Sequence, residues 1–262
     1  MKRYFRLYWV LLRGSWMAFV AYRVNFLNSI FAASCWSCLI ILSMYLLTSR
    51  VSRVFGWSRG ELLLLAGMYN VVIGLFYFLF SKNLDELQEL VHLGELDSLL
   101  LKPVDSQWLV SFSQVSWRSL ARLLIGFLFI SFLFFSHAVS FSWVSLVSFL
   151  PFIFLGISIM YGVSFGVMTL SVWFSNLHNL RDLLFYINTI TRYPGEMYRG
   201  GRELLFLFLF PLTLAVIVPT RVLAGKYYLG DLWGSVVFGV VFLVLSRKFW
   251  QFALRYYTSA SG

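Results

Sequence analysis

The sequence has few charged residues for its length. Only 12% of its 262 residues are Asp, Glu, Lys or Arg, whereas 60% are hydrophobic and 20% aromatic. A soluble domain usually carries about 25% charged residues, and a single core cannot bury such an apolar excess. The mean hydropathy of +0.80 leads to the same conclusion. We therefore exclude a soluble enzyme and expect an all-α polytopic membrane protein.

Residues that could carry chemistry are scarce as well. The two cysteines, Cys35 and Cys38, lie in an apolar run, which excludes a disulfide framework and a zinc site. The three histidines fall in separate loops, so we expect no metal site and no catalytic residues. The chain has no phosphate-binding Gly-x-x-x-x-Gly-Lys-(Ser/Thr) motif and no Rossmann glycine pattern. Any ATP and Mg²⁺ would therefore be bound by another chain.

Uncharged apolar windows predict six membrane spans, since a transmembrane helix needs about 20 mostly apolar residues. The spans predicted from them cover about residues 25–48, 62–80, 119–136, 143–174, 204–220 and 232–249, and Arg247 and Lys248 at the end of the last span can reach the headgroups. No soluble insert interrupts them, so residues 1–262 should form a single transmembrane domain. The interiors of these spans lack Asp, Glu, Lys and Arg, which argues against a proton- or sodium-coupled carrier.

The net charge of +10 fits a membrane protein better than a nucleic-acid binder. If both termini are cytoplasmic, 16 of the 21 Lys and Arg residues lie on the cytoplasmic side. This distribution obeys the positive-inside rule, and the reverse orientation breaks it. We expect the lipid bilayer, and no nucleic acid, among the partners.

The first 23 residues have the spacing of an amphipathic helix. Aromatic and apolar side chains recur every three or four residues, and Arg6 and Arg13 fall on other faces. We expect a helix that lies in the membrane interface and turns into the first span near Asn25. The alternative, an extension of that span into the cytoplasm, stays open for residues after Arg13.

The loop between spans 2 and 3 predicts a short amphipathic helix, Leu84–Leu93. Asn83 followed by Glu86 is typical of a helix N-cap with its acidic partner, and Gly94 suits the left-handed helix end. One stripe of this helix is apolar: Leu84, Leu87, Leu90 and Val91. The stripe could dock into a groove of another protein or rest on the bilayer or on this chain's own helices. The acidic flanks favour a protein partner modestly.

Two further features of the spans suggest structural roles. Gly156, Gly162 and Gly166 in the fourth span permit close helix packing. Pro211 lies within the short fifth span and Pro219 at its end, and the segment 220–231 follows. This arrangement predicts a re-entrant segment on the outer side before span 6. A kinked helix with a plain loop is the alternative.

Several motifs, taken together in order and spacing, resemble one family. They are the run Gly94–Val104, the Tyr22–Phe26 segment before the first span, Arg192-Tyr-Pro194, Tyr198 and the proline pair of span 5. They look like the corresponding segments of ABC-2-type permeases, the small six-helix membrane subunits of bacterial ATP-binding-cassette exporters. The resemblance covers nearly the whole chain. Lys102, where Arg is common, and the Phe-rich fifth span are minor departures.

The resemblance implies a role for each loop. The helix between spans 2 and 3 would be the coupling helix that seats in the ATPase subunit, through Leu84, Asp85, Leu87, Glu89, Leu90, Val91, Glu95 and Asp97. A second contact would come from a short helix within residues 179–190, near Arg181 and Asp182. Pro211, Pro219 and Arg221 would help to close the outer exit.

The resemblance also implies partners and a location. The chain would pair with a second permease chain, as a homodimer or related heterodimer, and with an ABC ATP-binding subunit. It would lie in the bacterial cytoplasmic (inner) membrane and export its substrate. The uncharged, Phe-rich spans favour an amphipathic, lipidic or peptidic substrate over a small ion. An ATP-independent channel or carrier is the main alternative, and a lipid-modifying membrane enzyme is a weaker one.

Overall fold

The computed structural model describes residues 2–50, 53–139, 142–174, 179–198 and 203–258, and within 2–3 and 203–209 the backbone alone. The helices are α1 (Lys2–Ala21), α2 (Arg23–Thr48), α3 (Arg59–Phe76), α4 (Lys82–His92), α5 (Leu96–Leu100), α6 (Ser106–Phe112), α7 (Ser119–Phe135), α8 (Trp143–Thr169), α9 (Leu180–Ile190), α10 (Glu203–Leu223) and α11 (Leu229–Ala253). Shorter turns are the π-helical η1 (Tyr77–Ser81) and the 3-10 turns η2 (Leu170–Val172) and η3 (Gly195–Tyr198). A hairpin of β1 (Arg53–Val54) and β2 (Trp57–Ser58) completes the described part of the chain.

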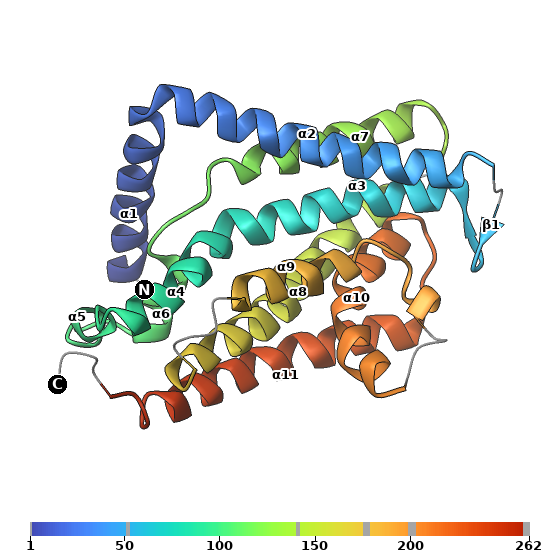
Figure 1. Ribbon diagram of the computed structural model, residues 1–262. Coiled ribbons are helices and arrows are strands. Elements are labelled where there is room, and N and C mark those ends of the chain that lie inside the picture. Colours follow the sequence, from blue (N-terminus) through green and yellow to red (C-terminus); the bar gives the residue numbers. More distant parts are fainter. Residues whose placement is uncertain (1, 51–52, 140–141, 175–178, 199–202, 259–262) are drawn as a thin grey trace.

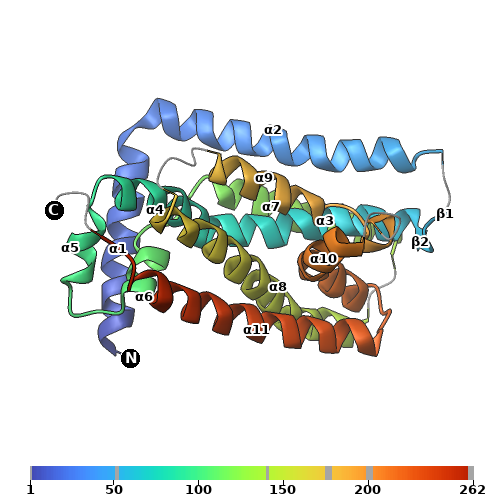
Figure 2. The same cartoon turned by 60° about the horizontal axis from the view of Figure 1, so that its bottom comes forward.

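The long helices run lengthwise in one elongated bundle (Figure 1). The α4 end of this bundle carries α4, α5, α6, the start of α1 and the end of α11, whereas the hairpin end carries β1 and β2. Helix α1 turns sharply away from α2 (Figures 1 and 2). It packs on the segment that links α6 to α7, through rings such as Trp16 against Trp117. The expected amphipathic N-terminal helix is therefore present, and its position in a membrane interface stays a prediction.

Helix α3 forms the centre of the bundle. Its residues from Leu62 to Gly74 are all buried, as expected for a helix that is apolar on every face. Two glycines allow α7 to approach closely: a Cβ at Gly74 would lie 2.9 Å from the backbone nitrogen of Leu123, and one at Gly126 would lie 2.9 Å from the carbonyl of Gly67. Small residues at a helix crossing are the usual device for close packing in membranes.

The outer helices bury only one stripe each. In α2 the buried residues are Ser37, Ile40, Met44 and Thr48, which recur every three or four positions. Four helices of the described chain are long and apolar enough to cross a membrane: Arg23–Thr48, Arg59–His92, Trp143–Val172 and Leu229–Ala253. Two further apolar helices, Ser119–Phe135 and Phe210–Leu223, are shorter. The all-α membrane class is thus confirmed, and the count of six spans stays a prediction.

The expected break between span 2 and the loop helix does not exist. Helices α3, η1 and α4 form one continuous helix, and Ser81 has ordinary helical dihedral angles (φ −59°, ψ −44°). An N-cap residue needs a non-helical conformation, so Asn83 as the N-cap of this helix was wrong. The helix end was predicted correctly, since Gly94 has a φ of +72°.

The re-entrant segment expected before span 6, around residues 220–231, stays a prediction. These residues form the last turn of α10, a tight turn at Gly225 (φ +74°) and the start of α11. Helix α10 is confined to the half of the bundle nearest the hairpin (Figures 1 and 2). Its residues from Pro211 to Thr220 are all buried.

The hairpin at residues 53–58 was not expected from the sequence. Phe55 (φ 51°) and Gly56 (φ 83°) form its two-residue loop, and positive φ at both positions is the signature of a type I′ turn. The following Ser58 caps α3 in a reciprocal capping box with Glu61. The Ser-x-x-Glu spacing before the apolar run is the signal that could have located this helix start.

Candidate functional site

The apolar stripe of α4 faces the inside of this chain. Leu84, Leu87 and Val91 are 2%, 0% and 6% exposed and belong to the main hydrophobic core. Leu90 is partly buried against the same core. The stripe therefore does not dock into a groove of another protein; it rests on this chain's own helices. A partner can reach only the opposite, polar face of α4.

That polar face borders a groove at the α4 end. The groove has a volume of about 410 Å³ and lies between the C-terminal half of α4 and the start of α9; we call it the coupling groove, lined by Asp85, Gln88, Glu89, His92, Leu93, Arg181 and Asp182. Four residues expected to contact an ATPase from two separate loops are thereby brought together: Asp85, Glu89, Arg181 and Asp182. Glu95 and Asp97, also expected at this contact, do not line the groove.

An ion pair fixes the two sides of the coupling groove. The Nε of Arg181 lies 3.4 Å from the carboxylate of Asp85, and its Nη2 donates a hydrogen bond to the Asp85 carbonyl at 3.1 Å. With Glu89 and Asp182, the groove holds three carboxylates and one guanidinium. Leu93, at the end of α4, is 62% exposed within this acidic rim. The surface therefore combines an apolar contact point with net negative charge.

Asn83, the residue misread as a cap, fastens α4 to the segment after α6. It is 2% exposed. Its Nδ2 donates to the carbonyls of Ser111 (2.8 Å) and Gln114 (2.7 Å), and its Oδ1 accepts from Ser113 Oγ and from the Gln114 N–H, both at 2.8 Å. Gln114 also donates to the carboxylate of Glu86 at 2.6 Å. Sequence reasoning missed this role because the partners lie about 30 residues away.

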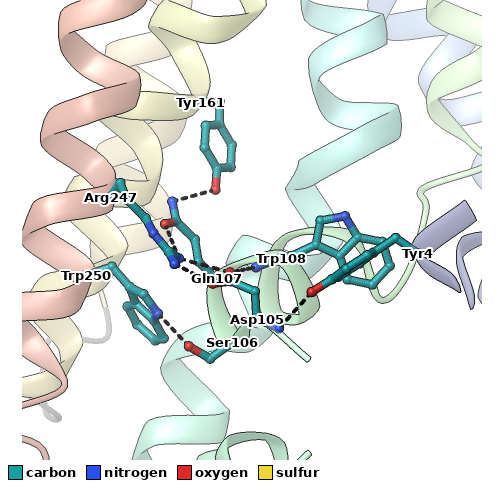
Figure 3. Close-up of polar contacts among 8 residues, drawn as sticks. All are labelled: Tyr4, Asp105, Ser106, Gln107, Trp108, Tyr161, Arg247 and Trp250. Carbon is teal, nitrogen blue, oxygen red and sulfur yellow. Dashed lines mark hydrogen bonds and ion pairs between the residues drawn. The ribbon is translucent and has the colours of Figure 1, made fainter. Parts of the chain in front are cut away.

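A second polar network at the α4 end ties α6 to α11 (Figure 3). Arg247 of α11 forms a two-pronged ion pair with Asp105, the N-cap of α6, and donates to Gln107 at 3.2 Å. Gln107 in turn donates to Tyr161 of α8, and Trp250 donates to a serine of α6. Burial raises the pKa of Asp105, but the hydrogen bonds from Arg247 and from a backbone N–H, with the Arg247 charge, lower it below its usual value.

Arg221 joins several segments at the hairpin end. Its guanidinium pairs with both Glu196 of η3 and Asp231 of α11. It also lies between two rings, 5.1 Å from the centroid of Trp57 and 4.8 Å from that of Tyr228. Arg221 was expected at the outer exit, and that role stays a prediction. Pro211 and Pro219 lie buried within α10.

The comparisons with known proteins identify the family. The family model described as ABC-2 family transporter protein matches residues 35–261. The chain belongs to the ABC-2 transporter family. Comparison with curated proteins and with solved structures returned no match. The resemblance drawn from the motifs is thus confirmed, and this ABC-2 protein is a multi-pass membrane protein of a family whose members are generally non-catalytic subunits associated with an ATP-binding subunit.

The glycines of α8 in this ABC-2 protein have different surroundings. A Cβ at Gly156 would collide with the carbonyl of Ala215 in α10, and one at Gly162 would lie 2.6 Å from the Cβ of Phe242 in α11. Nothing lies within 4 Å of a Cβ at Gly166. The first two glycines therefore sit at tight crossings inside the chain, whereas the third does not. In the described part of the chain, no group of His, Cys, Asp and Glu could hold a metal ion.

Proposed function

We propose that this chain is the permease subunit of an ATP-binding-cassette exporter and that its ATPase partner docks at the coupling groove. The observation that carries the proposal is the meeting of two segments about 90 residues apart in sequence, α4 and the start of α9, around one acidic groove. A partner element with basic residues around an apolar anchor complements this surface. ATP and Mg²⁺ are held by the partner, and this chain supplies no catalytic residue.

The continuous helix explains how movement of a partner reaches the core. Because α4 continues through η1 into α3 without a break, a push on α4 displaces the helix at the centre of the bundle. The Asn83 hydrogen bonds couple α4 at the same time to the end of α6 and to the segment that leads into α7. ATP-driven closure of two ATPase subunits would in this way drive alternating access and move the substrate outward.

The topology that we propose keeps six membrane crossings but assigns the fifth to a different segment of the chain. Arg181 contacts Asp85 at the α4 end, whereas the carboxylate of Glu196 accepts hydrogen bonds from Trp57 and Arg221 at the hairpin end. The segment 180–198 therefore runs between the two ends, and α10, confined to the hairpin half, is the re-entrant element of the outer side. Pro211, Pro219 and Arg221 would belong to that gate. The α4 end, with both termini, faces the cytoplasm.

The assembly is a pair of permease chains, identical or related, with two ATPase subunits in the bacterial inner membrane. The exposed apolar face of α2 suits either a second permease chain or lipid. An ATP-independent channel or carrier is the competing function. It requires no ATPase at the groove and would transport substrate as this chain alone in liposomes.

The test is co-purification of the tagged chain from its native membranes in mild detergent, with mass spectrometry of the proteins retained. The charge reversals Glu89→Lys and Asp182→Lys change exposed residues of the coupling groove. We expect both to abolish recovery of a protein with a Walker A motif. The matched control is Glu95→Lys, which alters an exposed carboxylate at the same end of the bundle but outside the groove and should leave recovery unchanged.

Two results would contradict the proposal. In the first, the wild-type chain purifies alone in several mild detergents and transports substrate by itself in liposomes. In the second, an ATPase co-purifies but the groove variants retain it as well as Glu95→Lys does, so the contact lies elsewhere.

A further inference from the structure

A second cavity near the α4 end has a different charge from the coupling groove. It has a volume of about 410 Å³ and lies between α2, η1 and the start of α7. We call it the arginine cavity; its lining includes Asn25, Asn28, Ala33, Tyr77, Arg118 and Arg122. The lining contains two arginines and no carboxylate. Its field therefore favours an anion.

Arg122 is the strongest sign that a ligand belongs here. Its side chain is buried, with 8% exposed, and its guanidinium lies 5.3 Å from the centroid of the Tyr77 ring. Among the described residues, no carboxylate lies within ion-pair distance of Arg122. A buried charge without a counter-charge is costly, and buried charges in proteins are normally paired. An anionic group in the cavity would supply the missing partner.

The wall formed by α2 changes from polar to apolar along the helix. Asn25 and Asn28 line the part of the cavity near the helix start, and Ala32 and Ala33 line the next turns. At about 1.5 Å per residue, the amides and the alanines lie about 6–12 Å apart along the axis. Outside the cavity, α2 exposes large apolar side chains such as Phe31 and Leu39. A ligand with an acid head and an apolar tail matches this gradient.

We propose that the arginine cavity binds the acid headgroup of an anionic amphiphile taken from the cytoplasmic leaflet, and that this is the class of substrate the permease exports. The orientation and the export role rest on the proposed function above, whereas the binding itself does not. The headgroup pairs with Arg122 and Arg118 and accepts hydrogen bonds from the α2 amides. The tail lies along the apolar surface of α2 in the bilayer. The cavity volume suits a headgroup, and the tail needs no pocket of its own.

The test measures binding to the permease alone, in nanodiscs of phosphatidylcholine, by titration calorimetry with empty nanodiscs as the blank. The probes are dodecyl phosphate, dodecyltrimethylammonium and inorganic phosphate. We expect saturable binding of dodecyl phosphate alone. Arg122→Gln should weaken it by about ten- to a hundredfold, because hydrogen bonds to charged groups are worth about 1.5–3 kcal/mol. Arg122→Lys should restore part of the affinity, and Arg13→Gln, an exposed arginine of α1, should change nothing.

Each part of this proposal would be contradicted by a different result. Unchanged binding in a folded Arg122→Gln protein, or equally tight binding of the cationic amphiphile, would overturn the site. Equally tight binding of inorganic phosphate would overturn the requirement for a tail. Nanodiscs with one-tenth phosphatidylglycerol should compete with dodecyl phosphate, and a lack of competition would overturn the leaflet as the source. Because no ATPase is present, failure of the proposed coupling cannot mimic any of these results.

Discussion

Replacing Asn83 with alanine should destabilise the protein more than any other single amide change at the α4 end. Asn83 is 2% exposed and makes four short hydrogen bonds, two donated by Nδ2 and two accepted by Oδ1, to the end of α6 and the segment after it. Three of the four partner groups are backbone groups of Ser111 and Gln114. In Asn83→Ala these groups lose their partner inside the protein.

The size of the effect follows from the number of bonds. At about 1 kcal/mol net for each hydrogen bond, the loss is about 3–5 kcal/mol. For a chain of this size, 1 kcal/mol corresponds to about 2–4 °C, so the melting temperature should fall by about 6–20 °C. The assay is thermal unfolding of the purified protein in mild detergent, followed by intrinsic fluorescence and by size-exclusion recovery.

Asn179→Ala is the matched control. Asn179 is exposed at the start of α9, and its side chain makes no capping hydrogen bond. The melting temperature of the Asn179→Ala protein should therefore stay within about 2 °C of the wild type. A similarly small change for Asn83→Ala would refute the role assigned to this amide and, with it, the rigid link between α4 and the connection from α6 to α7.

Three further perturbations separate the contacts of the bundle. Gly156→Ala should cost about 1–3 kcal/mol through overpacking against α10, whereas Gly166→Ala should be neutral because its Cβ meets open space; equal melting temperatures would contradict this. Arg221→Gln should destabilise the hairpin end by less than the roughly 3–5 kcal/mol of a fully buried pair, since its side chain keeps 16% exposure. An unchanged melting curve for Arg221→Gln would argue against a stabilising role of its ion pairs. The pKa of Asp105 is lowered in the folded state, so its stabilisation is present above the unfolded value of about 3.9 and lost as the pH falls through the folded-state pKa. Arg247→Gln should therefore reduce the loss of stability between neutral pH and about pH 3, and an identical pH profile would contradict the pairing.

Periodicity and local signals were sufficient for several helices. The expected window 119–136 matches α7, 143–174 matches α8 with η2, and the helix expected within residues 179–190 matches α9. The N-terminal amphipathic helix and the left-handed end at Gly94 were also correct. These features depend on apolar spacing or on one residue's backbone preference, and both can be read from a short window.

Features that depend on distant partners could not be read in this way. Asn83 beside acidic residues has the local pattern of an N-cap, but its partners come from residues 111–114 across the loop. The Leu84, Leu87 and Val91 stripe has the same periodicity whether it faces a partner or the chain's own core. The coupling groove needs α4 and α9 to meet, and nothing in either segment specifies the other. Sequence reasoning named the charged residues of this site but assigned part of the contact to side chains that are buried.

Site-specific photo-crosslinking in living cells tests the central claim most directly. A photoreactive amino acid replaces Leu93, which is 62% exposed in the coupling groove, or Leu101, which is 87% exposed outside it. We predict that the Leu93 position crosslinks to a protein with a Walker A motif and that the Leu101 position does so far less. Crosslinks from Leu93 to lipid or to a second copy of this chain, with none to an ATPase, would contradict the account.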